Sequence, residues 1–64
     1  MLKSKRLQHN KTMQDIADEL NTGLTIISYY ESYKRFPRAN DLMAFAKAYH
    51  LSDEELLEYL KKIS

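Results

Sequence analysis

The stretch TMQDIADELNTGLTIISYYES, residues 12–32, decides the fold of this chain. Thr12 and Asp15 have the spacing of a capping box, with Asp in place of Glu, so a helix should begin after Thr12. The tripeptide Asn-Thr-Gly at 21–23 should end that helix, because Asn and Gly tolerate the positive φ of a tight turn. A second helix should then cover about residues 24–32. The stretch therefore predicts two short helices joined by a tight turn.

The apolar residues of this stretch fit two helices that pack against each other. Ile16, Ala17 and Leu20 recur on one face of the first helix. Ile27 and Tyr30 should point inward from the second, and the small Ala17 side chain lets the two helices approach closely. Helices of eight or nine residues are marginal alone in water, so packing must hold them at a fixed angle. Two helices crossed in this way form the unit that places the second helix in a DNA major groove.

Three further helices are predicted around this pair. The first should run from about Leu2 to His9, and another should span about residues 39–49, after a loop that contains Pro37. Ser52 and Glu55 form a capping box for the last helix. The apolar positions of these last two helices are Leu42, Phe45, Ala46 and Tyr49, then Leu56, Leu57 and Leu60. We therefore predict an all-α, compact five-helix fold in which residues 1–64 form a single domain.

Composition excludes several classes of function. The 64 residues contain no cysteine, so no disulfide or thiolate-rich metal site is expected. His9 and His50 lie far apart in the chain without nearby partners at ligand spacing, so no metal or other cofactor is expected. No cysteine nucleophile, His–carboxylate pair or glycine-rich phosphate loop is present, which argues against an enzyme, and no small-molecule ligand is evident. No apolar run suits a membrane span or secretory signal, so a cytoplasmic location is the expected default.

Charge is divided unevenly between the two parts of the chain. Residues 1–38 carry seven Lys/Arg and four Asp/Glu, giving +3, whereas residues 39–64 carry three and five, giving −2. One part could therefore face a polyanion while the other faces away from it. Ordinary scatter of surface charge explains the same numbers equally well, so charge alone leaves both interpretations open.

Taken together in this order and spacing, the residues from Leu2 to about Leu57 resemble the lambda-repressor-like (Cro/repressor, or XRE) helix-turn-helix family. Residues 31–37 resemble the Glu-x-Gly-Lys-Arg-x-Pro exit of the recognition helix, and residues 42–57 resemble Leu-x-x-x-Ala-Lys-Ala-Leu-x-Val-Ser-x-x-Glu-Leu-Leu. The resemblance implies a sequence-specific transcriptional regulator of a prokaryote or phage, of the repressor, Cro or antitoxin type. It also implies a homodimer that binds a near-palindromic double-stranded DNA operator, with the helix at about 24–32 in the major groove.

The resemblance also implies roles for individual residues. Arg6 and Glu31 match an ion pair between the first and third helices. The positions that match DNA contacts are Thr12, Met13 and Gln14 for phosphate at a helix N-terminus, Leu24, Thr25, Ser28 and Tyr29 for bases, and Lys34, Arg35 and Arg38 for the DNA backbone. A dimer surface is implied at Phe36, Pro37, Tyr59 and Ile63.

This sequence departs from the family pattern at three places. Leu24 stands where Gln or Arg is common, so it can touch only thymine methyl groups. Met13 replaces a usual glutamine and removes one contact. Tyr33 replaces the glycine that ends the third helix, at a cost of about 1 kcal/mol or more if its backbone is left-handed.

A second function follows from the apolar residues around the third helix. An apolar-aromatic patch of Leu24, Ile26, Tyr29, Tyr33 and Phe36 would suit a helix-turn-helix that has become a protein-interaction module. The alternative is that Ile26 is partly core and that the tyrosines simply cover the end of the helix. The sequence leaves both interpretations open.

Overall fold

The computed structural model describes residues 1–62 and contains five α-helices with no strand among those residues. Their bounds are α1 Leu2–Gln8, α2 Met13–Glu19, α3 Leu24–Glu31, α4 Leu42–Ala48 and α5 Asp53–Lys61, with a 3-10 turn, η1, at Ala39–Asp41. The predicted all-α class is thus confirmed. Within the described residues, every helix falls short of the length and apolarity that a membrane crossing requires.

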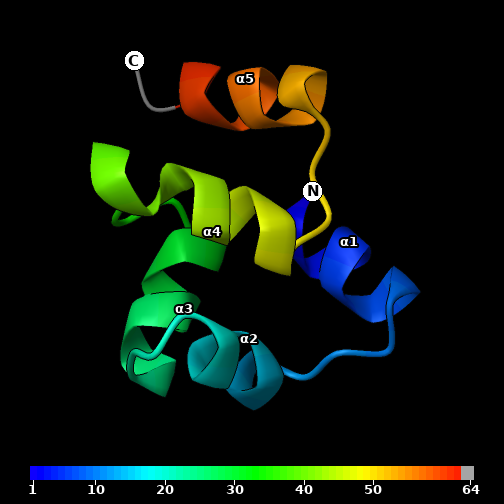
Figure 1. The fold of residues 1–64 in the computed structure, drawn as a ribbon, viewed down its shortest axis with the longest axis vertical. Coiled ribbons are helices and arrows are strands. Elements are labelled where there is room, and N and C mark those ends of the chain that lie inside the picture. Colours follow the sequence, from blue (N-terminus) through cyan, green and yellow to red (C-terminus); the bar gives the residue numbers. More distant parts are fainter. Residues whose placement is uncertain (63–64) are drawn as a thin grey trace.

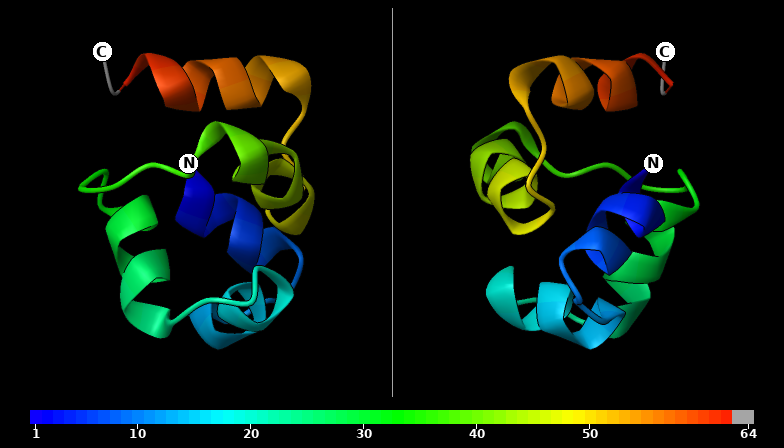
Figure 2. Two further views of the ribbon diagram at one scale, coloured as in Figure 1. Left: turned by 60° about the vertical axis from the view of Figure 1, so that its left-hand side comes forward. Right: turned by 90° about the vertical axis from the view of Figure 1, so that its right-hand side faces the viewer.

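The helices lie at two opposite ends of the molecule, with α4 between them. Figures 1 and 2 show α2 and α3 together at one end, α5 across the other end, and α4 between them. α1, at the beginning of the chain, lies beside α4 (Figures 1 and 2). The Cα radius of gyration is 10.5 Å, and the principal extents are 27 × 21 × 20 Å.

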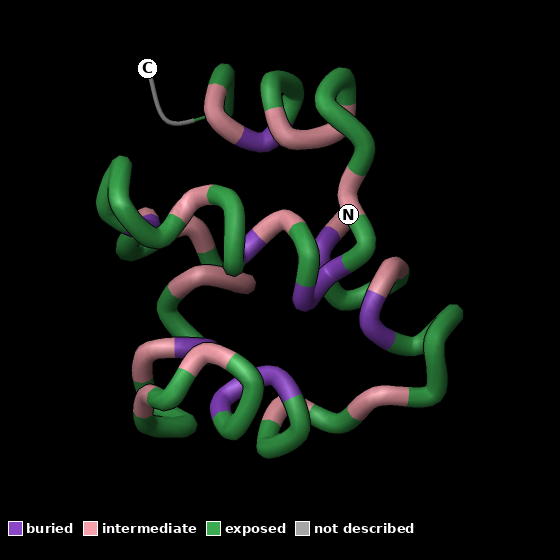
Figure 3. Tube along the Cα trace, viewed as in Figure 1, coloured by how far each residue is buried: buried purple, intermediate pink, exposed green. Residues whose placement is uncertain are grey.

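All five helices contribute to one core, which Figure 3 shows on their inward sides. The side chains exposed by 3% or less are Leu2, Ile16, Ala17, Ile27, Phe45, Ala48, Tyr49 and Tyr59. The expected inward residues Ile16, Ala17 and Ile27 are confirmed, and Leu20 and Tyr30 pack against the same core. The core therefore fixes the two crossed helices against α1, α4 and α5.

The two C-terminal helices differ from expectation in detail. The predicted helix over about 39–49 begins as the 3-10 turn η1, and regular α4 starts only at Leu42. In α5 the deeply buried residue is Tyr59, whereas Leu57 is 58% exposed. Leu56, Tyr59 and Leu60, spaced i, i+3 and i+4, form the inward face of α5, and Leu57 lies outside it.

Both predicted capping boxes are present. At the start of α2, Thr12 Oγ1 accepts a hydrogen bond from Asp15 N (3.1 Å), and Thr12 N donates to Asp15 Oδ2 (2.8 Å). At the start of α5, Ser52 Oγ accepts from Glu55 N (3.2 Å), and Ser52 N donates to Glu55 Oε1 (2.9 Å). The backbone N–H of Thr12 lowers the pKa of Asp15, and the backbone N–H of Ser52 does the same for Glu55, aided by Lys5. These local bonds explain where α2 and α5 begin.

Four helices end in the same way without any glycine. The residue after each C-cap has a left-handed backbone: Asn10 after α1 (φ 56°), Asn21 after α2 (53°), Tyr33 after α3 (60°) and His50 after α4 (55°). After α3, Lys34 N donates to Tyr29 O (2.9 Å) and Tyr33 N donates to Tyr30 O (3.4 Å), the pair of bonds of a Schellman motif. Asparagine tolerates this conformation, but a tyrosine there is strained. The sequence predicted a cost at Tyr33 if its backbone were left-handed, and the structure shows that it is.

Strain at Tyr33 leads to a stability prediction. We expect Tyr33→Gly to be more stable than Tyr33→Ala by about 1 kcal/mol, because both lose the ring and only glycine adopts positive φ without cost. The measurement is the urea midpoint of each variant. At Glu58, an exposed position inside α5, the order should reverse, with alanine ahead by about 1 kcal/mol. An alanine variant at 33 as stable as the glycine variant would show that this backbone is unstrained.

The two histidines, remote in sequence, meet in the fold. The rings of His9 and His50 stack with centroids 3.8 Å apart and an interplanar angle of 21°. No group of three or more potential metal ligands occurs in residues 1–62. Loss of water around the stack, followed by the nearby charges of His50, Lys5 and Lys11, lowers the pKa of His9. The neutral form of His9 is therefore the one that favours the fold.

The lowered pKa of His9 predicts how stability responds to pH. Stability from this group is complete above the ordinary histidine pKa of about 6.5 and is lost as pH falls through the lower folded value. We expect a lower urea midpoint at about pH 5.5 than at about pH 7.5, before most carboxylates titrate. In His9→Gln the midpoint should change little over this interval. An equal decrease of the urea midpoint in the parent and in His9→Gln would mean that a group other than His9 titrates.

Candidate nucleic-acid interface

α2 and α3 cross at the turn that the sequence predicted. Ala17 is fully buried at this crossing, and Thr22 N donates to Ala17 O (2.9 Å) to close the end of α2. The left-handed Asn21 directs the chain into α3, whose first residue is Leu24. Ile27 holds the inward side of α3 at 0% exposure. The opposite side of α3 is therefore presented outward from a rigid base.

The outward side of α3 carries the expected base-facing residues. Leu24 is 48% exposed and Tyr29 is 37% exposed, and both Thr25 and Ser28 are exposed. The hydroxyl groups of Thr25, Ser28 and Tyr29 can donate or accept hydrogen bonds. Leu24 supplies an apolar group beside them. The structure thus brings all four residues to one face, which carries one apolar side chain and three hydroxyl groups.

The suggested apolar-aromatic patch is much smaller in the structure than in the sequence. Tyr33 and Phe36 pack against the core, and both rings contact Tyr59 at centroid distances of 5.6 and 5.7 Å. Ile26 is half-buried. Only Leu24 and Tyr29 remain exposed, too few for a continuous apolar surface.

The N-terminus of α2 is less open to an anion than the sequence suggested. Thr12 and Asp15 are engaged with each other in the capping box. Gln14 Nε2 donates to Asp18 Oδ1 (3.0 Å), and Met13 is half-buried against the core. The backbone N–H groups of Met13 and Gln14 are the donors that remain for a phosphate at this end.

Ion pairs divide the positive charge of the N-terminal part into two sets. Lys5 pairs with Glu55 (3.0 Å), and Lys11 pairs with Glu19 (2.7 Å). Arg6 pairs with Glu31. No ion pair within residues 1–62 engages the exposed side chains Lys3, Lys34, Arg35 and Arg38. These four carry the positive charge that remains for an external anion.

Lys3 is a candidate that the sequence reasoning did not identify. It lines an open hollow of about 330 Å³ together with Met13, Ser28 and Ser32, above the Arg6–Glu31 pair. Lys3 therefore lies next to the outward side of α3, although it belongs to α1. The sequence carried no signal for Lys3, because its lack of an acidic partner can be seen only in the folded structure.

Comparison with known families agrees with this geometry. A family model described as helix-turn-helix, of the Cro/repressor (XRE) type, matches residues 2–56. The chain belongs to this family. Comparisons with curated proteins and with solved structures return no match. The match covers α1 to α4 and the first half of α5, so the lambda-repressor-like assignment is confirmed, and the chain is a DNA-binding helix-turn-helix domain.

The helix-turn-helix is held to the rest of the domain by the predicted pair of Arg6 and Glu31. Arg6 Nε donates to Glu31 Oε2 (2.8 Å) and Arg6 Nη2 donates to Glu31 Oε1 (3.1 Å), a two-bond arrangement. Tyr49 Oη donates to Glu31 Oε2 (2.8 Å), which adds α4 to the link between α1 and α3. The bond to Glu31 raises the pKa of Arg6, and burial followed by the bond to Glu31 raises that of Tyr49. The recognition helix is thus anchored at its last residue by two neighbouring helices.

The predicted dimer surface requires a correction. Tyr59 is fully buried in the core of the domain, and Pro37 is buried as well, so neither side chain is open to a partner. Phe36 is half-buried against Tyr59. Ile63 lies outside the described residues. Tyr59 was assigned to this surface by the family resemblance, which does not say which side of α5 meets the core in this chain.

Proposed function

We propose that this domain is a sequence-specific transcriptional regulator that inserts α3 into the major groove of a near-palindromic operator as a dimer. The observation that carries the proposal is the outward side of α3. There Leu24, Thr25, Ser28 and Tyr29 lie together, while the other side of the helix is fixed to the core. Repressor or Cro-like action in a prokaryotic or phage-infected cell is part of the same proposal.

The unpaired cations support contact with the DNA backbone on either side of the groove. Lys34, Arg35 and Arg38 follow α3 in an exposed loop, and Lys3 lies next to Ser28. Backbone contacts of this kind set affinity and position, whereas the side chains on α3 would set sequence preference. Because Leu24 offers only apolar contact, we expect thymine-rich half-sites, where it meets methyl groups.

A salt series on duplexes selected from a random library tests the proposal. Four phosphate contacts per subunit predict a slope of about −3.6 for log K against log salt, so affinity per subunit should fall about 150-fold between about 50 and 200 mM salt. Lys34→Ala should make that slope shallower by about 0.9. If no duplex binds at low salt, the regulator proposal fails.

A further inference from the structure

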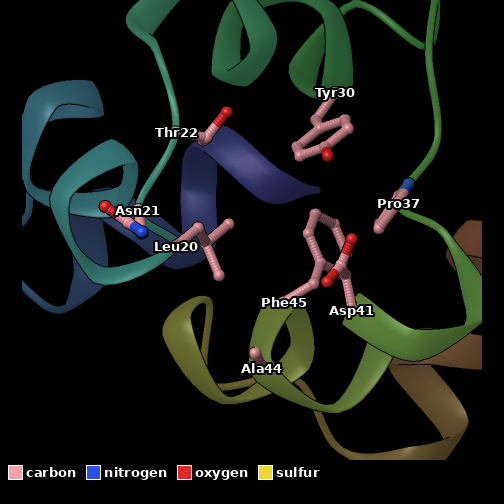
Figure 4. A pocket seen from close by; sticks show the side chains of 8 residues that line it. All are labelled: Leu20, Asn21, Thr22, Tyr30, Pro37, Asp41, Ala44 and Phe45. Atoms are coloured by element: carbon pink, nitrogen blue, oxygen red, sulfur yellow. The ribbon is translucent and has the colours of Figure 1, made fainter.

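A cavity of about 260 Å³ opens beside the helix-turn-helix, between its turn, α3 and α4 (Figure 4). Four of its lining residues are polar: Asn21 and Thr22 from the turn, Tyr30 from α3, and Asp41 from the segment before α4. The volume far exceeds the roughly 30 Å³ of one water molecule and lies just below the roughly 300–1,000 Å³ of sites for drug-sized ligands. The cavity therefore suits a molecule of metabolite size.

The rest of the lining is apolar and comes from different parts of the chain. Leu20 lies on the turn side, Pro37 on the loop side, and Ala44 and Phe45 on α4. The rings of Tyr30 and Phe45 meet edge to face, with centroids 5.5 Å apart and an interplanar angle of 87°. This fixed aromatic surface can hold an apolar group, while the polar residues orient it.

Asp41 supplies a negative charge at this cavity. It is the last residue of η1, which runs directly into α4, and its side chain makes no capping hydrogen bond. No ion pair among the described residues engages it either. In Figure 4 its carboxylate and the Tyr30 hydroxyl project toward the same part of the cavity. Burial followed by the charge of Asp41 raises the pKa of Tyr30, while Arg35 and Arg38 act in the opposite direction.

Positive charge lies in a second hollow that borders this cavity. This second hollow of about 190 Å³ shares Thr22, Tyr30 and Asp41 with the first and adds Arg35 and Arg38. The carboxylate of Asp41 and the guanidinium groups of Arg35 and Arg38 therefore line the same hollow. This arrangement complements a ligand that carries both charges a short distance apart.

We propose that the cavity binds a small zwitterion of the α-amino-acid class. The ligand's ammonium group meets Asp41, its carboxylate meets Arg35 and Arg38, and its apolar side chain enters between Leu20 and Phe45. The proposal goes beyond DNA binding and assigns a ligand site where the sequence alone indicated none. Its regulatory consequence does rest on the proposed function: since Arg35 and Arg38 are also assigned to phosphate, the ligand would compete with DNA and weaken operator binding.

The test is a titration of the isotope-labelled protein, without DNA, with each of the twenty free L-amino acids at about 10 mM, followed by amide chemical shifts. This concentration detects a Kd in the millimolar range. We expect apolar amino acids to shift the amides of residues 20–22, 30 and 41–45 in a saturable manner. If none does, the proposal is overturned, and a test without DNA leaves the regulator proposal unaffected.

Analogues and variants test the assignment of the charges. For leucine, the matched compounds are 3-methylbutylamine, which lacks the carboxylate, and 4-methylpentanoate, which lacks the ammonium group. Each should bind about tenfold or more weakly than leucine, and Asp41→Asn should weaken leucine to a similar extent. Asp53→Asn, an exposed carboxylate at the start of α5, should leave binding unchanged. Equal binding of the amine and leucine, or unchanged binding to Asp41→Asn, would overturn the assignment.

Discussion

Glu31→Leu is expected to lower the free energy of unfolding by about 3 kcal/mol or more, because it leaves the Arg6 guanidinium buried without a counter-charge. The side chains of Arg6 and Glu31 are only 8% and 11% exposed. Tyr49 Oη would lose its acceptor at the same time. A chain of 64 residues has a total stability of about 3 to 10 kcal/mol, so this variant should lose between about a third and all of its stability.

Urea denaturation followed by circular dichroism measures this loss. The informative control is the triple variant Arg6→Met, Glu31→Leu, Tyr49→Phe, which replaces the whole polar cluster by apolar groups of similar size. We expect it to recover most of the lost stability, since well-packed apolar replacements of buried ion pairs are often neutral or better. A single variant within about 1 kcal/mol of the parent would mean that water compensates Arg6 and that the pair does not anchor α3.

The features that the sequence predicted correctly depend on residues close together in the chain. A capping box is decided within four residues, so Thr12–Asp15 and Ser52–Glu55 could be recognised before any packing was known. The turn at Asn21 follows from the same kind of local preference. The Arg6–Glu31 pair spans 25 positions, and it was predicted from the family pattern because spacing alone gives no such contact.

The errors arose where packing between distant segments decides the outcome. Helical periodicity identifies an apolar stripe on α5 but does not define its edges, so Leu57 was expected among the apolar positions with Leu56, although it is 58% exposed. Tyr59 was assigned to a dimer surface by the family pattern, and it is buried in the core. The stack of His9 on His50 brings together two helix ends that lie 41 positions apart in the sequence.

The candidate interface also combines features that the sequence predicted with features that only the fold reveals. The sequence predicted which residues α3 would present, because a helix of known register has a known outer side. It did not predict that Lys5 and Lys11 would be paired, since they find their partners through the fold. The net charge of residues 1–38 therefore indicated a basic part, while the structure shows where that charge is free.

Tyr29→Ala and Arg38→Ala are expected to weaken DNA binding in different ways, and their comparison tests the assigned roles most directly. Tyr29 lies on the outward side of α3, so its loss should reduce affinity for the selected operator by about tenfold or more and leave affinity for an unrelated duplex unchanged. Arg38 lies in the loop after α3 and is assigned to phosphate. Its loss should reduce affinity for both duplexes by the same factor and make the salt slope shallower by about 0.9 per subunit, or about 1.8 for the dimer.

Fluorescence anisotropy with the two duplexes at several salt concentrations separates these outcomes. Glu58→Ala, an exposed change on α5 far in sequence from the helix-turn-helix, serves as the control and should bind both duplexes like the parent. Because Tyr29 and Arg38 are both exposed, neither variant should unfold, and urea midpoints will verify this. Equal losses on both duplexes for Tyr29→Ala would mean that Tyr29 contacts the DNA backbone and that sequence preference comes from Leu24, Thr25 and Ser28 alone.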